Sequence, residues 1–375
     1  MEVVYCSRCV LSNIDVHDIE FDENGVCNYC RAYDKNSSGI LFNEDLKEKK
    51  LEEIVKRIKA EGIGRPYDCV LGISGGVDSS YLAFMASKLD LRILVVHYDN
   101  GWNSGLAVKN IENIVNKLNL DLYTYVNDWY EYRDLQLAFL KASVIDIELI
   151  TDHAIVAALY LVARRYKIKN ILFGDNHATE SILPPSWYHW KNDLLNIRAI
   201  HRKFGTIPLK TYPVINFYNR LLIDYFRNTN FISLLNYMDY DKEKAKKTMI
   251  EEVGWSDYGG KHFESIFTRF YQGYILPVKF GVDKRKAHFS SLILAGQMTR
   301  AEALEELKTN PYTPEQARED KEYVIKKFGL TAEEFENIMK LPVKSHYDYP
   351  SYITKHYKYM AYLGSIKRKL SLTKR

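Results

Sequence analysis

The sequence predicts an α/β fold: a parallel sheet with helices on both faces, preceded by a small cysteine-rich lobe and followed by a helical C-terminal region. Three observations predict it. Paired cysteines open the chain, apolar strand-like segments alternate with helix-like segments in its middle, and charged helices joined by aromatic, glycine-containing loops follow. A chain of 375 residues is long enough for two or three domains. We expect their bounds at residues 1–40, 41–230 and 231–375.

The N-terminal lobe contains two Cys-x-x-Cys pairs separated by seventeen residues. Each pair can form a tight turn that points two thiolates at one centre, and two such turns supply the tetrahedral sulfur ligands that zinc accepts. Disulfides would need an oxidising compartment, which nothing in the sequence implies. A four-sulfur site leaves no open coordination position, so we expect a structural Zn²⁺, and docking of a partner on this lobe stays open. The expected ligands are Cys6, Cys9, Cys27 and Cys30.

The middle of the chain alternates between helix-like and strand-like segments. A charged amphipathic helix over residues 43–62 ends at Gly62, and an Asn-Gly turn at residues 100–101 ends the second strand. Apolar strands that alternate with helices form parallel sheets that are buried on both faces. The predicted strands are 67–73, 92–100, 121–127 and 169–176, and the predicted helices between them are 77–90, 104–120 and 150–167.

Between the first strand and its helix lies the segment SGGVDSS, residues 74–80. The carboxyl end of a parallel strand is where such sheets bind ligands. Two adjacent glycines let backbone N–H groups approach an anion, hydroxyl groups add donors, and the helix N-terminus adds its positive dipole end. The segment therefore predicts a phosphate-binding loop. The alternative is an ordinary strand-to-helix turn with glycines for close packing.

The loop differs from the Walker type, which needs a lysine that reaches the terminal phosphates. Here the first helical turn carries Asp78 instead. A carboxylate beside a polyphosphate is repulsive unless a cation lies between them, and Mg²⁺ binds through one or two carboxylates together with phosphate oxygens. We therefore expect Asp78 to be a magnesium ligand.

SGGVDSS resembles the PP-loop of the ATP pyrophosphatase superfamily, and the resemblance implies an adenine-nucleotide alpha-hydrolase-like fold. It also implies that ATP binds here, that a carbonyl oxygen of the substrate is adenylated with release of pyrophosphate, and that a nucleophile then displaces AMP. The adenosine would lie at the end of the second strand. The residues assigned to ATP and Mg²⁺ are Ser74, Gly75, Gly76, Asp78, Ser79 and Ser80, with His97 and Asp99 beside the adenosine.

Polar residues also follow a later strand at the same edge of the sheet. Because the carboxyl ends of parallel strands meet at one edge, we expect these residues near the loop. A turn followed by a helix cap is the alternative for them. A second polar group opens the helix 150–167 and either caps it or contacts substrate or nucleotide. The first group is Gly174, Asp175, Asn176 and Glu180, and the second is Thr151 and Asp152.

The number of cysteines also limits which nucleophile could displace AMP. Four of the five are expected to bind zinc, and Cys69 lies within a strand, where we interpret it as a buried apolar thiol. No cysteine remains for a redox-active thiolase or for a cysteine-dependent glutaminase. We therefore expect ammonia, taken from solution or from a separate glutaminase subunit. A tRNA thiolase of the same superfamily and a non-enzymatic zinc-ribbon binding module remain alternatives.

A closer resemblance covers nearly the whole chain. The cysteine lobe, YDCVLGISGGVDSSYLA, TDHAI and above all the block from Gly254 to Leu304 resemble the N-acetyl sugar amidotransferase family of surface-polysaccharide (lipopolysaccharide and O-antigen) and nonulosonic-acid biosynthesis. The resemblance implies an ATP-dependent enzyme that converts an acetamido group of a sugar into an acetamidino group. A glutaminase subunit would deliver the ammonia, and the sugar would be free or nucleotide-linked.

Basic residues and histidines gather in the C-terminal block, between glycines and aromatic residues and without helical spacing. A run of charges is usually a solvated face. The functional alternative is that cations stabilise charge on the phosphates and that a histidine transfers a proton as ammonia adds. The candidates are Lys261, His262, Glu264, Arg269, Lys279, Lys284, Arg285 and His288; the proposed catalytic group is Asp78, Lys279, Lys284, Arg285 and His288.

Composition excludes some classes of protein. The net charge of +4 is too mild to indicate a nucleic-acid binder, and the basic run at residues 365–375 is interpreted as a solvated terminus. The longest apolar run, residues 154–163, is too short to span a bilayer, and the first residues lack the pattern of a signal peptide. We expect a cytoplasmic protein that binds neither membranes nor nucleic acid.

Overall fold

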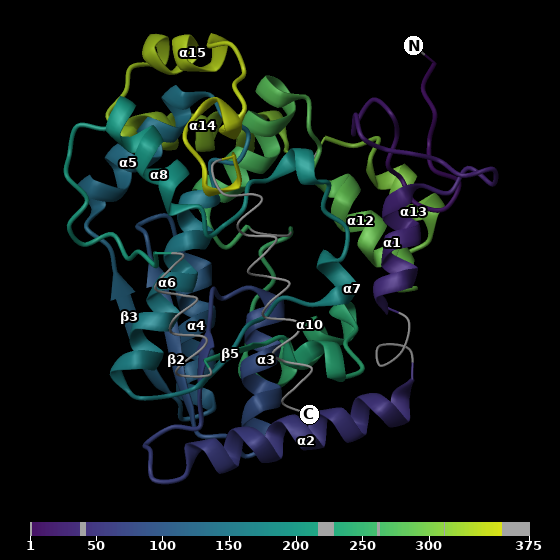
Figure 1. Ribbon diagram of the computed structural model, residues 1–375, viewed down its shortest axis with the longest axis vertical. Helices are drawn as coiled ribbons and strands as arrows, with labels where there is room; N and C mark the ends of the chain where they lie inside the picture. Colours follow the sequence, from purple (N-terminus) through teal and green to yellow (C-terminus); the bar gives the residue numbers. More distant parts are fainter. Residues whose placement is uncertain (1, 38–42, 217–228, 261–262, 311, 355–375) are drawn as a thin grey trace.

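The central sheet of the described residues has five strands in the order β3-β2-β1-β4-β5. The computed structural model describes residues 2–37, 43–216, 229–260, 263–310 and 312–354 (Figure 1). Every neighbouring pair of strands is parallel, which confirms the predicted fold class. The strands are β1 (Cys69–Gly72), β2 (Ile93–Asp99), β3 (Asp121–Val126), β4 (Asn170–Leu172) and β5 (Asn230–Ile232).

The predicted helices are present, and one further helix lies between β3 and α6. This helix, α5 (Trp129–Ala142), begins after Asp128, whose carboxylate accepts hydrogen bonds from the first free N–H groups. The remaining helices are α1 (Asn28–Ser37), α2 (Glu44–Gly62), α3 (Val77–Lys88), α4 (Gly105–Lys117), α6 (Leu149–Arg165), α7 (His177–Glu180), α8 (Leu194–Phe204), α10 (Lys242–Val253), α11 (Ile266–Phe270), α12 (Arg285–Leu294), α13 (Arg300–Glu306), α14 (Pro314–Phe328) and α15 (Ala332–Lys340), with the π-helix η4 (Tyr271–Phe280) and the short 3₁₀ turns η2 (Pro185–Trp187), η3 (Leu234–Tyr237) and η5 (His346–Asp348).

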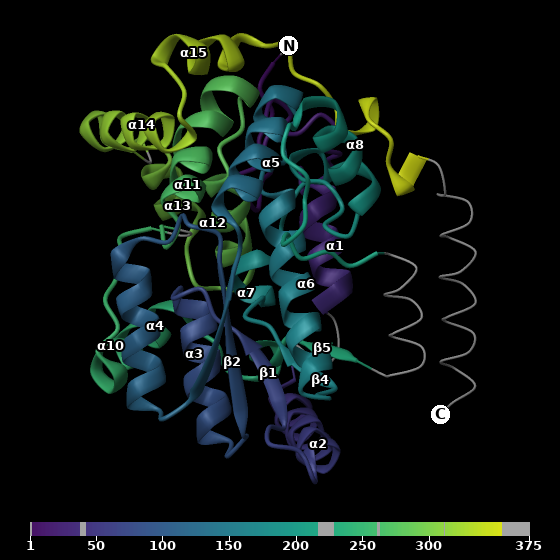
Figure 2. The same cartoon turned by 90° about the vertical axis from the view of Figure 1, so that its left-hand side faces the viewer.

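Helices cover both faces of the sheet because successive side chains of a strand point to opposite sides. On β1, Cys69 and Leu71 belong to an apolar cluster that also contains side chains of α2, α3, α4 and α10. Val70, between them, packs on the other face with α6. Figure 2 shows the sheet between these two layers. The edge strand β3 is the exception, since none of its residues is buried.

The C-terminal region packs against the sheet domain through aromatic side chains. Trp102 follows β2 and is fully buried; its ring contacts Phe267 of α11 and Phe328 of α14, each with 5.3 Å between ring centroids. Ile266 N–H donates to the carbonyl of Trp102 (2.9 Å). These contacts fix α11 beside the connection between β2 and α4, at the carboxyl edge of the sheet.

The three-domain division stays a prediction. β5 pairs with β4, and α10 packs in the same cluster as α3, so residues on both sides of the expected boundary at 230 share one core. Within the described part of the chain, no helix combines the length and the apolar character that crossing a membrane requires.

Candidate active site

The segment after β1 forms a tight loop that leads directly into α3. Gly75 has φ +85°, and a Cβ atom at this position would lie 2.6 Å from the carbonyl oxygen of Ala107. Trp255 donates its indole N–H to the carbonyl of Gly75 (2.9 Å). Ser74 and Ser79 hold the loop together, with 3.2 Å between their hydroxyl oxygens. The sequence therefore needs glycine at position 75 for both backbone conformation and space.

We predict that Gly75→Ala disturbs the loop more than a comparable change elsewhere. Gly64 also has a positive φ (+74°) but no atom within 4 Å of a new Cβ, so Gly64→Ala isolates the backbone cost of about 1 kcal/mol. Gly75→Ala adds the clash with Ala107 and should cost about 3 kcal/mol or more. Urea denaturation measures both, and ATP binding should weaken only for Gly75→Ala. Equal effects of the two changes would contradict this account of the loop.

Asp78 lies in the first turn of α3 and receives a hydrogen bond from the hydroxyl of Tyr240. Burial and the negative charge of Asp78 raise the pKa of Tyr240, so the phenol stays protonated and donates. Two further carboxylates lie nearby. Glu180 contributes to the raised pKa of Tyr240, and burial together with Glu180 raises the pKa of Asp175. The structure thus brings the predicted residues Asp78, Asp175 and Glu180 to one edge of the sheet.

These oxygen donors suit a hard cation such as Mg²⁺. They do not form a closed cage: among the described residues, only the four cysteines place three or more metal-binding atoms within 4.8 Å of one another. This fits an ion that keeps several waters or phosphate oxygens and takes one or two ligands from the protein. Asp78 remains the predicted magnesium ligand.

The other predicted nucleotide-binding residues surround the loop. Ser80 is fully buried, and its hydroxyl has no hydrogen-bond partner. Gly174 packs on the loop helix, since a Cβ there would lie 3.0 Å from the backbone nitrogen of Ser79. Asn176 caps α7 through the N–H of Thr179 (2.9 Å). The structure thus shows a helix cap for Asn176 and close packing for Gly174. Contact of these residues with the nucleotide stays a prediction.

His97 and Asp99 shape the connection after β2. The ring of His97 donates from Nδ1 to the carbonyl of Ile73 (3.1 Å) and accepts at Nε2 from the amide of Asn103 (3.0 Å). Burial lowers the pKa of His97, which favours the neutral ring that this pattern requires. Asp99 accepts hydrogen bonds from the same amide (3.1 Å) and from the N–H of Gly101 (2.8 Å). Both side chains therefore have partners within the chain.

Lys284 and His288 lie one helical turn apart at the start of α12. His288 donates from Nδ1 to the carbonyl of Thr179 (3.0 Å) in α7, the helix that ends at Glu180. Lys284 lies among the charged groups around the N-terminus of α6, where burial and the charge of Lys191 lower its pKa. The structure thus places these two predicted residues beside the carboxyl edge of the sheet.

Three other basic candidates have partners in the helical region. Lys279 donates to the carbonyls of Ile338, Met339 and Leu341 at the end of α15, each at 2.9 Å. Arg285 pairs with Asp283 (2.6 Å), and Arg269 pairs with Asp320 (2.7 Å). Their functional roles stay predictions, and Lys261 and His262 lie outside the described residues.

At the start of α6, the structure rules out the cap for Thr151 and Asp152, and contact with substrate or nucleotide stays a prediction. The cap position is Glu148, which makes no capping hydrogen bond, so neither Thr151 nor Asp152 is the cap. Thr151 instead lies 2.6 Å from the hydroxyl of Tyr132, and Asp152 pairs with Lys191 at 2.9 Å.

Sequence reasoning missed Tyr240, Glu148 and Lys191 at this edge. Tyr240 lies 162 positions from Asp78, and no motif connects the two. A signal existed for Glu148, because an acidic residue within the apolar segment VIDIELI is unusual.

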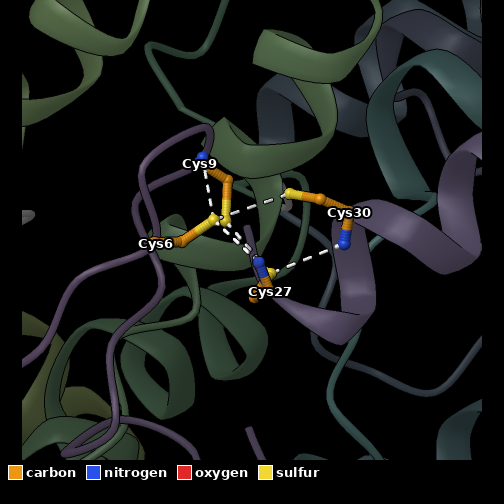
Figure 3. Close-up of side chains that lie close together, drawn as sticks. All are labelled: Cys6, Cys9, Cys27 and Cys30. Carbon is orange, nitrogen blue, oxygen red and sulfur yellow. Dashed lines mark hydrogen bonds between the residues drawn. The ribbon is translucent and has the colours of Figure 1, made fainter. Parts of the chain in front are cut away.

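The four paired cysteines converge on one point (Figure 3). The sulfur atoms of Cys6 and Cys30 are 3.9 Å apart, and those of Cys9 and Cys27 are 3.7 Å apart. A tetrahedron with Zn–S bonds of 2.3 Å has edges of about 3.8 Å, so the thiols fit zinc. Backbone N–H groups of Cys9 (3.4 Å) and Cys27 (3.3 Å) point at the sulfur of Cys6. Cys69 is fully buried in β1, as expected, and burial raises its pKa.

The cysteine lobe docks on α12 and α13. Arg300 donates to the carbonyls of Cys9 (3.0 Å) and Cys6 (3.1 Å). Lys286 of α12 pairs with the partly buried carboxylate of Asp15 (2.5 Å). The lobe therefore supports the helix that begins directly after Lys284.

Part of the chain is similar to a known protein family. Residues 264–363 match the family model "LPS biosynthesis protein WbpG-like, C-terminal domain". No curated protein matches the chain. Similar solved structures include NMN synthetase from Francisella tularensis, with 14% identity, a TM-score of 0.30, and coverage of 81% of this chain and 98% of that one. Another is the NH3-dependent NAD synthetase from Campylobacter jejuni, with 13% identity, a TM-score of 0.29, and coverage of 56% and 84%.

The matched region begins at Glu264 and contains α11, η4 and α12, which carry Thr268, Lys284 and His288 to the edge of the sheet. The predicted resemblance to a family of surface-polysaccharide biosynthesis is thereby confirmed for this region. Residues 264–363 are thus similar to the C-terminal domain of WbpG-like proteins of lipopolysaccharide biosynthesis.

Proposed function

We propose that the protein is an ATP-dependent amidotransferase synthetase subunit that converts the acetamido group of an N-acetyl sugar into an acetamidino group. The proposal is supported by two groups of residues that lie at the same edge of the sheet. The glycine loop with Asp78 in its first helical turn shares the carboxyl edge of the sheet with Lys284 and His288 of the WbpG-like region. The first part suits a nucleotide polyphosphate, and the second adds cationic and proton-transferring groups beside it.

The chemistry explains why ATP is needed. An amide oxygen is a poor leaving group, whereas AMP is a good one. Attack of the amide oxygen on the α-phosphorus releases pyrophosphate and leaves an O-adenylated cationic imidate. Ammonia adds to the imidate carbon, and the C–O bond breaks with its electrons going to AMP. Mg²⁺ bound at Asp78 would neutralise phosphate charge, while backbone N–H groups of the loop and Lys284 would bind phosphate oxygens.

The remaining assignments belong to the same proposal. The four cysteines hold a structural Zn²⁺ that supports α12 and takes no part in the chemistry. A separate glutaminase subunit supplies ammonia in the cytoplasm, since glutamine hydrolysis of this kind needs a reactive cysteine. Cys69 is buried, and the other four cysteines form the metal cluster.

The test is an assay of the purified protein with ATP, Mg²⁺, ammonium chloride and a panel of N-acetyl sugars, both free and nucleotide-linked. Mass spectrometry should detect AMP and a sugar lighter by the difference between an oxygen atom and an NH group. Both products should require ammonium and the same sugar. A product that forms only with tRNA and sulfide would replace the proposal by the thiolase alternative.

A further inference from the structure

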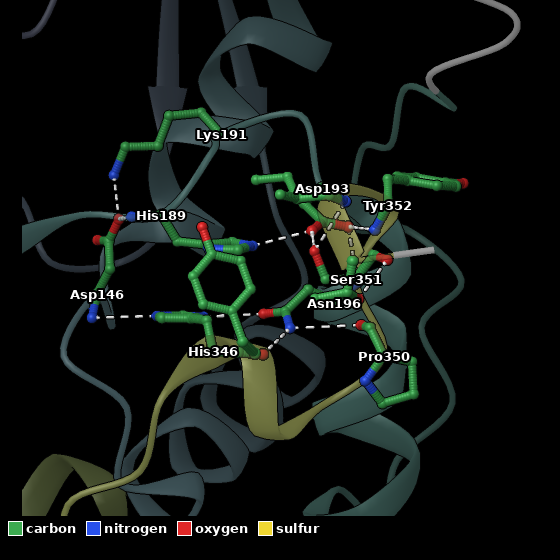
Figure 4. A network of polar contacts seen from close by, with 12 residues as sticks. Asp146, His189, Lys191, Asp193, Asn196, His346, Pro350, Ser351 and Tyr352 are labelled. Carbon is green, nitrogen blue, oxygen red and sulfur yellow. Dashed lines mark hydrogen bonds and ion pairs between the residues drawn. The ribbon is translucent and has the colours of Figure 1, made fainter. Parts of the chain in front are cut away.

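A partly buried cluster of charged side chains surrounds the N-terminus of α6, with Asp146 and Glu148 buried within it. Lys191 donates to Asp146 at 2.6 Å and pairs with Asp152 at 2.9 Å. Figure 4 shows Lys191 and Asp146 at one end of a polar network that runs through His189 toward Asp193. Glu148 and Lys284 complete the cluster, since both interact electrostatically with Asp146 and Asp152.

One carboxylate oxygen of Glu148 accepts a hydrogen bond from the protein, and the other, the orphan oxygen, accepts none. Its Oε2 accepts a hydrogen bond from the hydroxyl of Thr268 (2.9 Å). Its Oε1 is buried without any hydrogen-bond partner, in a residue that is only 8% exposed. Leaving a buried acceptor unsatisfied is unfavourable, and more so for a charged group. The orphan oxygen therefore indicates a ligand with an N–H or O–H donor.

The charges around Glu148 specify the ligand further. Three carboxyl groups face two lysine ammonium groups, so one negative charge remains when all are ionised. Lys191 is already bound to Asp146 and Asp152. Within the described part of the chain, the ammonium of Lys284 forms no ion pair with a carboxylate. A small cation with N–H donors would satisfy both the excess charge and the orphan oxygen.

The pKa of Glu148 lies in the range that a base needs at neutral pH. Burial and the charge of Asp152 raise it to about 7, against a hydrogen bond from Thr268 and the charge of Lys284, which lower it. Two buried phenols also face the carboxyl group. The titratable and charged groups around Glu148 are Asp146, Asp152, Lys191, Lys284, Tyr132 and Tyr271.

One short segment connects this cluster to the nucleotide loop. Glu264 lies beside the loop, with its Oε1 3.6 Å from the position of a Cβ at Gly76. Four residues further along, Thr268 donates to Glu148. Glu264 and Ser265 precede α11, and Thr268 lies in its first turn, so the four residues span at most about 14 Å. Glu148 therefore lies toward the same edge of the sheet as the loop.

We propose that Glu148 binds ammonium through its orphan Oε1 and acts as the general base that converts it into ammonia. The proposal rests on the proposed function. A proton passes from ammonium to the carboxylate, and the freed lone pair forms the C–N bond at the imidate carbon. The adduct nitrogen loses a second proton to a phosphate oxygen of the departing AMP, the C–O bond breaks, and an amidinium product remains.

Glu148→Gln is the test, because glutamine keeps the shape and the acceptor for Thr268 but cannot take a proton. Wild-type kcat/KM for total ammonium should rise through about pH 7 and then level off, since ionised Glu148 accepts the proton. The variant must use free ammonia, so its kcat/KM should increase in proportion to the free-ammonia fraction beyond that pH. At neutral pH the loss should be on the order of 100-fold.

Two further measurements make the outcome specific. Sugar-dependent exchange of pyrophosphate into ATP without ammonium reports adenylation alone and should be equal in wild type and Glu148→Gln. Glu112→Gln, on the exposed surface of α4, should match wild type throughout. Equal exchange with an unchanged ammonium profile in Glu148→Gln would overturn the role of Glu148 only. Absence of exchange in the wild type would overturn the proposed function and the general base with it.

Discussion

Asp78→Asn is expected to lower the rate of pyrophosphate release by on the order of 100-fold, since a metal ion at transferring phosphates supplies several kcal/mol. Asparagine keeps the shape and can still accept a hydrogen bond from Tyr240. It removes the negative charge that would hold Mg²⁺ between α3 and the phosphates. Sugar-dependent pyrophosphate release at saturating ATP measures the effect, and raising the Mg²⁺ concentration should restore part of the rate.

Asp90→Asn is the matched control. Asp90 follows the opposite end of the same helix, is exposed and forms an ion pair with Lys59 (3.4 Å). Its φ of +56° is one that asparagine tolerates. Both variants should retain their zinc and their thermal stability within about 1 kcal/mol. Near-normal turnover of Asp78→Asn at low Mg²⁺ would refute the magnesium assignment and would separate Asp78 from phosphate chemistry.

The sequence was sufficient to predict a structural feature where that feature depends on residues that are neighbours along the chain. The loop is such a case, because two glycines, an apolar strand before them and a helix after them occupy consecutive positions. The four-cysteine cluster is another, since Cys-x-x-Cys spacing determines how each pair turns. The parallel sheet follows from the alternation of short apolar strands with helices, a pattern that survives even in the three-residue strand β4.

The sequence was insufficient to predict the role of a side chain where segments distant along the chain determine its environment. Lys279, Arg285 and Lys284 look alike as basic residues of one block. Only the fold shows that Lys279 binds carbonyls at the end of α15 and that Lys284 lies among the acidic groups around the N-terminus of α6. Glu148 acquires its raised pKa through burial and the charge of Asp152, and its side chain bonds to Thr268 of α11. Such burial depends on packing between residues more than a hundred positions apart, which no local pattern records.

Removal of the zinc is expected to cause the largest loss of stability. The N-terminal lobe is small, and its cysteines are fully buried around the proposed metal. Structural zinc contributes about 10–16 kcal/mol to folding in isolated zinc-finger peptides. Cys27→Ser should therefore unfold residues 2–37 and release the metal. Metal analysis and thermal denaturation measure the loss, and Cys69→Ala is the control, since it removes a buried thiol outside the metal site at a cost of about 1 kcal/mol.

The effect should extend to the reaction although zinc takes no part in it. Arg300 and Lys286 bind the lobe to α13 and α12, and the first turn of α12 follows Lys284 and holds His288. When the lobe unfolds, these helices lose their support, so kcat should fall in Cys27→Ser together with the zinc content. Wild-type protein treated with a chelator should lose activity in parallel and regain it with Zn²⁺. Full activity and unchanged stability in metal-free protein would show that α12 holds its place without the lobe.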